Sequence, residues 1–214
     1  MADKFDYSRL KEGKFYDFMR PLGRLVVRKT WKVAYTGQEH IPAEGGLILA
    51  CNHLHAMDPL VIAMGIPDRQ LHFMAKKELY DNWIVNKLFT AVNAFPIVRG
   101  SGDKTAFNYA VRVVKEGYIL GIFPEGTRSK TGEPGTAKSG VALIAKEAQA
   151  DILPVSVYSS DKLKKHTKYT VRFGEVIPFA SLGLHEDSGK TELKEASQMI
   201  MAQVRALWEE GHCE

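Results

Sequence analysis

A histidine and an aspartate stand close together directly after an apolar run. His53 and Asp58 follow the stretch at 46–51 and are separated by four residues. On one helix this spacing would put the two side chains on different faces, but a loop that leads into a helix can fold Asp58 back toward His53. A carboxylate on one imidazole nitrogen fixes the tautomer and leaves the other nitrogen free as a base. The pair therefore predicts general base catalysis.

Two alternative interpretations of these residues stay open at the level of sequence. Asp58 precedes Pro59, and an aspartate before a proline is a good N-cap for a helix that begins there. The spacing alone does not choose between capping and catalysis. A metal-dependent hydrolase is the second alternative, because His53, His55 and Asp58 are possible ligands. Against it, the sequence has no other histidine cluster that would complete a coordination shell.

Two further polar clusters have the composition of anion-binding sites. Arg99 stands in a glycine-containing loop between a predicted strand and a predicted helix, where free backbone N–H groups favour an anion. The run of Glu125, Gly126, Thr127 and Arg128 follows another predicted strand. A guanidinium can clamp a phosphate bidentately, glycine permits a turn with positive φ, and the threonine adds a hydroxyl donor. An ordinary solvated turn is the simpler alternative for each cluster.

All of these clusters follow directly on predicted strands. The central apolar runs are continuous rather than alternating, which indicates a sheet buried on both faces and hence a layered α/β fold, largely parallel or mixed, flanked by helices. In such sheets ligands collect at the carboxyl ends of strands. The strands are predicted at 33–36, 46–51, 71–75, 94–98, 118–123, 152–158 and 169–173, and the helices at 59–64, 77–92, 104–116, 141–148 and 191–209.

The first 32 residues differ from the rest and are predicted to form amphipathic, membrane-associating helices, with the remaining domain at 33–214. Pro21 should divide this leader into two helices. In the second, arginines or lysines recur every four residues opposite an apolar side, which is typical of a helix that lies in a membrane interface. An amphipathic helix packed on the domain is the alternative. No run is long and apolar enough to span a bilayer, and no signal peptide is visible, so we expect a cytoplasmic protein attached peripherally to a membrane.

The bulk composition is consistent with this interpretation. The hydrophobic fraction is 45%, the charged fraction is 25% and the formal net charge is +4. These values are typical of one globular domain. The charge favours anionic partners such as phosphates, acidic headgroups or an acidic carrier protein, but is too small to indicate nucleic acid.

Taken together, the clusters resemble the glycerophospholipid acyltransferase family, in particular the 1-acylglycerol-3-phosphate acyltransferases. Asn52, His53 and Asp58 match the NHxxxxD motif, Lys76 and Arg99 have the spacing of the second motif, the run at 123–129 matches the third, and the run at 152–155 matches the apolar fourth. The four motifs occur in family order over residues 41–157. One departure is Asn86, where the second motif usually has glycine.

The resemblance implies a role for each matching residue. It implies that His53 is the general base and Asp58 its orienting partner, and that Lys76, Arg99 and Arg128 bind phosphate. The other acceptor-site residues that it implies are Asn52, Glu125, Gly126 and Thr127.

The expected reaction is transfer of a fatty acyl group from a thioester, acyl-CoA or acyl carrier protein, to the sn-2 hydroxyl of 1-acylglycerol 3-phosphate, giving phosphatidic acid for phospholipid biosynthesis. Neither a metal nor a resident cofactor is expected. Another lysolipid or glycerol 3-phosphate is the alternative acceptor. A non-catalytic module that binds membrane lipid is the alternative from a different class of function.

Overall fold

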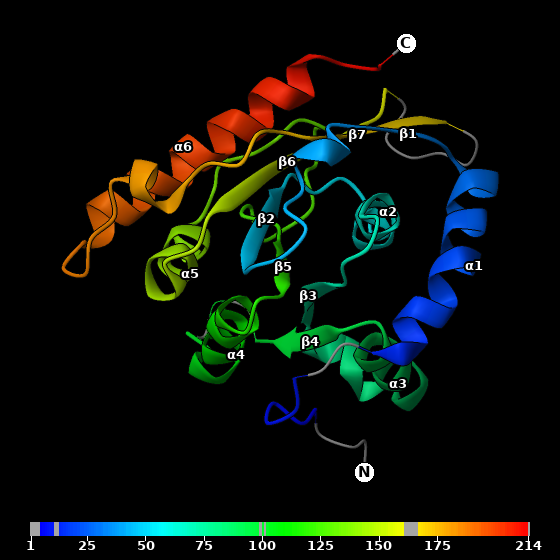
Figure 1. Cartoon of the computed structure of the whole chain (residues 1–214), viewed down its shortest axis with the longest axis horizontal. Coiled ribbons are helices and arrows are strands. Elements are labelled where there is room, and N and C mark those ends of the chain that lie inside the picture. The colour runs from blue at the N-terminus through cyan, green and yellow to red at the C-terminus, as the bar shows by residue number, and fades with distance from the viewer. Residues whose placement is uncertain (1–4, 11–12, 99, 101, 161–166, 214) are drawn as a thin grey trace.

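The predicted strands form one mixed sheet in the computed structural model, which describes residues 5–10, 13–98, 100, 102–160 and 167–213. The sheet has the order β1-β7-β6-β2-β5-β3-β4 (Figure 1). Each strand lies within a residue or two of its predicted position, so the predicted layered α/β fold is confirmed. The strands are β1 Lys32–Thr36, β2 Leu47–Cys51, β3 Leu71–Lys76, β4 Ala94–Ile97, β5 Ile119–Ile122, β6 Ile152–Tyr158 and β7 Lys168–Phe173.

Five of the strands end at the same edge of the sheet. β2 pairs in parallel with β5 and β6, β3 pairs in parallel with β4 and β5, and only the pairing of β6 with β7 is antiparallel. β1 then runs parallel to β7 at the other end of the sheet. We call the edge where β2 to β6 end the carboxyl edge. The loops that carry the polar clusters therefore leave the sheet side by side.

Helices cover both faces of the sheet. α1 and α2 share one apolar core, and α4, α5 and α6 share the other. Alternate residues of β2 enter the two cores, Leu49 into the first and Ile48 into the second, which explains its continuous apolar run. The helices are α1 Lys14–Thr30, α2 Asp58–Gly65, α3 Trp83–Ala91, α4 Lys104–Lys115, α5 Gly140–Ala148 and α6 Lys190–Glu209, with 3₁₀ turns η1 Gln38–His40, η2 Lys77–Asp81 and η3 Phe179–Leu182.

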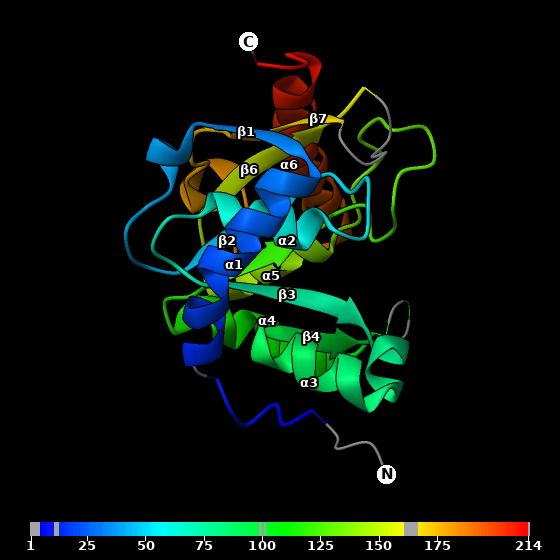
Figure 2. The same cartoon turned by 90° about the vertical axis from the view of Figure 1, so that its right-hand side faces the viewer.

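The prediction that Pro21 divides the leader into two helices is wrong, because α1 continues through it (Figure 2). A proline inside a helix removes one hydrogen bond and costs about 3 kcal/mol. Here both halves are anchored in the same core. Tyr16 is buried before the proline, and Val27 is buried after it. Burial on both sides offsets the local cost and keeps the two halves in line.

The predicted helix at 77–92 is also wrong in part, since it is broken at Asn82. The side chain of Asn82 accepts hydrogen bonds from the backbone N–H groups of Ile84 and Val85 at 2.9 and 3.3 Å. This is an N-cap, and it separates the 3₁₀ turn η2 from α3. The break lets the chain turn around the end of the sheet before it returns to β4.

Two arginines of the basic side of α1 contact the protein. Arg24 donates hydrogen bonds to the backbone carbonyls of Met64, Ile66 and Pro67, and Arg20 donates to Pro67 at 2.7 Å. These carbonyls lie at or just beyond the end of α2, where a cation is favoured. The apolar side of α1 is consequently exposed. No helix within the described ranges is both long and apolar enough to cross a bilayer.

Candidate active site

The loop between β2 and α2 brings His53 and Asp58 together. His53 Nδ1 lies 2.8 Å from Asp58 Oδ2, although four residues separate them in sequence. The same carboxylate oxygen accepts hydrogen bonds from the backbone N–H groups of Leu54 at 2.6 Å and His55 at 2.8 Å. Asp58 is fully buried, so these N–H donors satisfy a carboxylate oxygen that water does not reach. The loop is thus folded around one carboxylate oxygen.

The alternative role of Asp58 as an N-cap is wrong. The cap position of α2 is Met57, and no side chain caps that end of the helix. An N-cap carboxylate accepts from N–H groups that follow it in the chain, whereas Asp58 accepts from residues that precede it. The carboxylate therefore serves the histidine loop rather than the helix.

The ring of His53 is held flat against an aromatic side chain. Its centroid lies 4.0 Å from that of Phe123, with 17° between the planes, and Phe123 is stacked in turn on Phe73 at 5.6 Å. No residue in the described part of the chain hydrogen-bonds to Nε2 of His53. With Nδ1 on Asp58 and the ring face on Phe123, Nε2 is the atom available to act as a base.

The backbone of His53 is fixed by Glu125. The His53 N–H donates to Glu125 Oε1 at 3.0 Å, and the backbone of Gly135 lies next to the same carboxylate. Burial raises the pKa of the Glu125 carboxyl, and the neighbouring backbone N–H groups of His53 and Gly135 partly oppose that rise. The carboxylate thus joins the histidine loop to the long loop at 123–139. Glu125 thus contacts protein backbone, and its part in shaping the acceptor site, which the resemblance implies, stays a prediction.

We expect Gly135→Ala to lower kcat about tenfold or more. A Cβ at Gly135 would lie 2.8 Å from Glu125 Oε2, so the carboxylate must shift away from the His53 N–H. Small displacements of a catalytic group carry large rate costs. The matched control is Gly140→Ala, where a Cβ meets nothing within 4 Å. Steady-state kinetics of the two variants measure the difference, and equal rates would contradict this role for Glu125.

The third cluster lies beside the histidine. The Ser129 N–H donates to the His53 carbonyl at 2.7 Å, so the backbone next to Arg128 is fixed against the loop that carries His53. Gly126 has φ +71°, and its N–H donates to Phe123 O at 2.9 Å, which closes the turn that the sequence predicted. Thr127 and Arg128 are exposed. Arg128 has no hydrogen bond or ion pair with any residue that the structure describes, so its guanidinium is available to an anion.

The remaining predicted residues have different surroundings. Lys76 ends β3 at the carboxyl edge, is half exposed and pairs with Glu78 at 3.2 Å. Asn52 is buried, donates to Val157 O at 2.9 Å and accepts from Val157 N at 2.8 Å, so its amide ties β2 to β6. Arg99 lies outside the described residues.

The geometry also bears on the metal-hydrolase alternative. His55 Nδ1 lies 3.2 Å from the Met57 N–H, which donates to it. Within the described ranges, no group of three or more His, Cys, Asp or Glu side chains is placed to share a metal ion. The His53–Asp58 pair is therefore arranged as a hydrogen-bonded dyad.

Sequence reasoning missed the support that α6 gives to the site. Gln198 donates to the Ala137 carbonyl at 2.9 Å, and Arg205 donates to the Pro134 carbonyl. Ala137 also packs with Met201 and Val204 in a small apolar cluster. These contacts hold the far side of the loop that Glu125 joins to His53. The sequence gives no local signal for them, because more than sixty residues separate the partners.

Comparison with known proteins shows the family of this chain. The model of the Acyltransferase family matches residues 32–158. A 1-acyl-sn-glycerol-3-phosphate acyltransferase from Bacillus subtilis is 31% identical over 75% of this chain and 81% of its own length. The protein of the same name from Streptococcus pneumoniae is 30% identical over 92% of this chain and 74% of its own.

A solved structure shows the same fold. The crystal structure of the 1-acyl-sn-glycerophosphate (LPA) acyltransferase PlsC from Thermotoga maritima superposes with a TM-score of 0.67 at 23% identity, over 89% of this chain and 78% of that one. The matched family region contains the His53–Asp58 dyad and the loop at 123–139. On these matches, the chain belongs to the acyltransferase family.

Proposed function

We propose that this protein transfers a fatty acyl group from a thioester to the sn-2 hydroxyl of 1-acylglycerol 3-phosphate, giving phosphatidic acid for phospholipid synthesis, with His53 as the general base. The observation that carries the proposal is the His53 Nδ1–Asp58 Oδ2 contact of 2.8 Å beside the exposed, unpaired Arg128, as judged within the described residues. The names of the Bacillus and Streptococcus relatives support the choice of acceptor.

The proposed chemistry needs only one proton relay. Nε2 of His53 takes the proton from the acceptor hydroxyl as its oxygen attacks the thioester carbonyl. The tetrahedral intermediate collapses, the C–S bond breaks, and the imidazolium returns the proton to the leaving thiolate. Asp58 keeps the other nitrogen protonated and stabilises the imidazolium. Burial raises the pKa of the Cys51 thiol at the end of β2, so this cysteine is no nucleophile.

The phosphate of the acceptor is assigned to the cations around the turn at 123–128. Arg128 offers a planar guanidinium that matches a phosphate bidentately. Lys138 comes close to the same turn, since a Cβ at Gly126 would lie 3.0 Å from Lys138 Nζ. Lys76 at the end of β3 is the third cation of this edge. A phosphate held there would place the glycerol next to His53, because Ser129 N lies 2.7 Å from the His53 carbonyl oxygen.

The acyl donor is proposed to be acyl-CoA or an acyl carrier protein, and the protein is proposed to work peripherally on a membrane surface through the exposed apolar side of α1. The test is thiol release from each donor with 1-acylglycerol 3-phosphate, glycerol 3-phosphate or a choline lysolipid as acceptor. The proposal expects thiol release with 1-acylglycerol 3-phosphate. Thiol release with glycerol 3-phosphate but not with 1-acylglycerol 3-phosphate would overturn the choice of acceptor. If no combination of donor and acceptor released thiol, the proposed acyltransferase activity would be overturned.

Arg128→Ala should raise the KM for the acceptor about 10- to 100-fold, because a hydrogen bond to a charged group contributes about 1.5–3 kcal/mol. The KM for the thioester and the melting temperature should change little, since Arg128 is exposed and forms no hydrogen bond or ion pair with the described protein groups. Arg128→Lys should recover part of the affinity. Lys115→Ala, an exposed cation at the end of α4, is the control. An unchanged acceptor KM would contradict the phosphate assignment.

A further inference from the structure

A second helix exposes apolar side chains at the end of the sheet where β3 and β4 lie. Trp83 and Ile84 begin α3 and are 62% and 57% exposed. They share one side of the helix with Leu88, by the 3.6-residue period, while Asn86 points inward. Leu79 in the preceding turn η2 is exposed as well. We call these four side chains, Leu79, Trp83, Ile84 and Leu88, the α3 patch.

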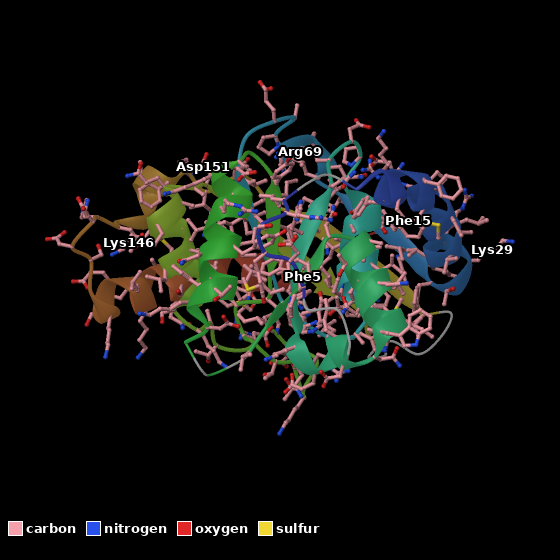
Figure 3. The ribbon with its side chains drawn as sticks, turned by 90° about the horizontal axis from the view of Figure 1, so that it is seen from below. Phe5, Phe15, Lys29, Arg69, Lys146 and Asp151 are labelled. Atoms are coloured by element: carbon pink, nitrogen blue, oxygen red, sulfur yellow. The ribbon has the colours of Figure 1, made fainter. Side chains whose placement is uncertain are left out.

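The end of α3 lies beside the start of α1. Gln70 ties the two helices together: its Oε1 accepts from the Gly13 N–H at 2.9 Å, just before α1, and from Asn93 Nδ2 at 2.7 Å, just after α3. α1 exposes Phe15, Phe18, Leu22, Leu25 and Val26, with Phe18 at 78%. Seen from below, α3 faces the viewer, and Phe15 and Lys29 mark α1 next to it (Figure 3).

Both α1 and α3 are joined in the chain to the carboxyl edge of the sheet, where His53 lies. α3 is reached from the carboxyl edge, because η2 follows directly on β3 and α3 returns to β4. α1 runs the other way and leads into β1, which starts at that edge because it is antiparallel to the catalytic strands. The two apolar surfaces therefore have a fixed angle to each other and a fixed position relative to His53.

The chemistry of the α3 patch fits a lipid bilayer with anionic headgroups. Lys87 Nζ lies 5.2 Å above the centroid of the Trp83 ring, which pairs an aromatic side chain with a cation as membrane interfaces favour. The same segment has two acids: Glu78 is paired with Lys76, and Asp81 is exposed. The apolar side chains of the patch stand on the outside of a helix, where a flat lipid surface can cover them together with those of α1.

We propose that the α3 patch is a second membrane-docking surface, which inserts into an anionic bilayer beside α1 and so orients the His53 end of the sheet toward the lipid. Docking of the α3 patch on a membrane does not depend on the reaction. That this docking orients His53 toward a lipid acceptor rests on the proposed function. A large apolar surface left exposed on a protein marks a partner or a membrane, and the pairing of Trp83 with Lys87 favours an anionic bilayer.

The first experiment measures binding to vesicles of equal parts phosphatidylglycerol and phosphatidylcholine. Trp83→Ser/Leu88→Ser should weaken co-sedimentation at least about tenfold, since each large side chain loses its transfer from water to lipid. Met199→Ser, an exposed apolar side chain on α6, is the matched control and should bind like the unmodified protein. Equal binding of the double variant would overturn the proposal. So would a dimer in lipid-free solution that the double variant abolishes.

The second experiment asks whether Trp83 enters the lipid. The chain has three tryptophans, so the fluorescence component that Trp83→Phe removes reports on this position alone. Brominated phospholipid should quench that component in the vesicle-bound protein, and an unquenched component would overturn the proposal.

A third experiment, which measures turnover of acceptor in detergent and in vesicles, separates the docking proposal from the proposed function. The double variant should keep its rate with acceptor dispersed in detergent and lose it with acceptor in vesicles. If the unmodified protein turned over neither form, the proposed function would fail, while the binding and quenching results would still decide whether the α3 patch docks.

Discussion

His53→Ala is expected to lower kcat about 10²- to 10⁴-fold, the usual contribution of general acid–base catalysis. The variant removes the only group of the dyad that can accept a proton from the hydroxyl. Substrate binding should change little, because the proposed phosphate contacts come from Arg128 and its neighbours. Thiol-release kinetics under saturating substrate measure the loss in kcat.

The fold should survive this substitution. The imidazole packs on Phe123 at the surface end of a core, with 11% of its side chain exposed, so truncation should cost no more than roughly 1–2 kcal/mol. The control is His185→Ala, an exposed histidine before α6. Thermal unfolding of both variants should remain cooperative. Near-normal turnover by a folded His53→Ala protein would exclude His53 as the base.

Asp58→Asn is expected to lower kcat to a similar extent, by up to about 10⁴-fold near neutral pH, as for the carboxylate of a serine protease triad. An amide carries no charge to stabilise the imidazolium. Its carbonyl oxygen can still accept from the N–H groups of Leu54 and His55, so the loop should keep its shape.

Asp58→Ala separates the two roles of this carboxylate, which are support of the imidazole and hydrogen bonding to the loop backbone. It leaves both backbone N–H groups without their acceptor, which costs about 1–3 kcal/mol for each buried donor. We therefore expect Asp58→Asn to lose activity with little change in melting temperature, and Asp58→Ala to lose both. Asp68→Asn, an exposed aspartate, is the control for the charge change. Full activity of Asp58→Asn would show that the carboxylate does not act through His53.

The sheet could be predicted from the sequence because its signals are local. The unbroken apolar run at 47–51 reflects burial of alternate residues on two faces, and the polar residues that follow it mark the strand end. The continuity of α1 could not be predicted in this way. It depends on burial of Tyr16 and Val27 and on carbonyls near the end of α2, which lie forty residues or more from Arg24.

The candidate site was predictable in its residue types and less so in its contacts. Motif spacing pointed to His53, Asp58 and Arg128, and the structure brings the loops that carry them together. The inward turn of Glu125 depends on Gly135, ten residues later, and on the backbone of His53. The support from Gln198 and Arg205 depends on the docking of α6. Neither set of contacts produces a periodicity or a motif spacing that could be recognised in the sequence.

The contacts of α6 with the loop at 123–139 also determine when the proposed active site can form during synthesis of the chain. β2 lies between β5 and β6, and the loop at 123–139 is held by Gln198 and Arg205, so the site is complete only after all of these have been made. At about 5–20 residues per second, a ribosome makes α1 on the order of ten seconds before α6. The exposed apolar side of α1 is therefore synthesised well before the proposed site around His53 can be complete.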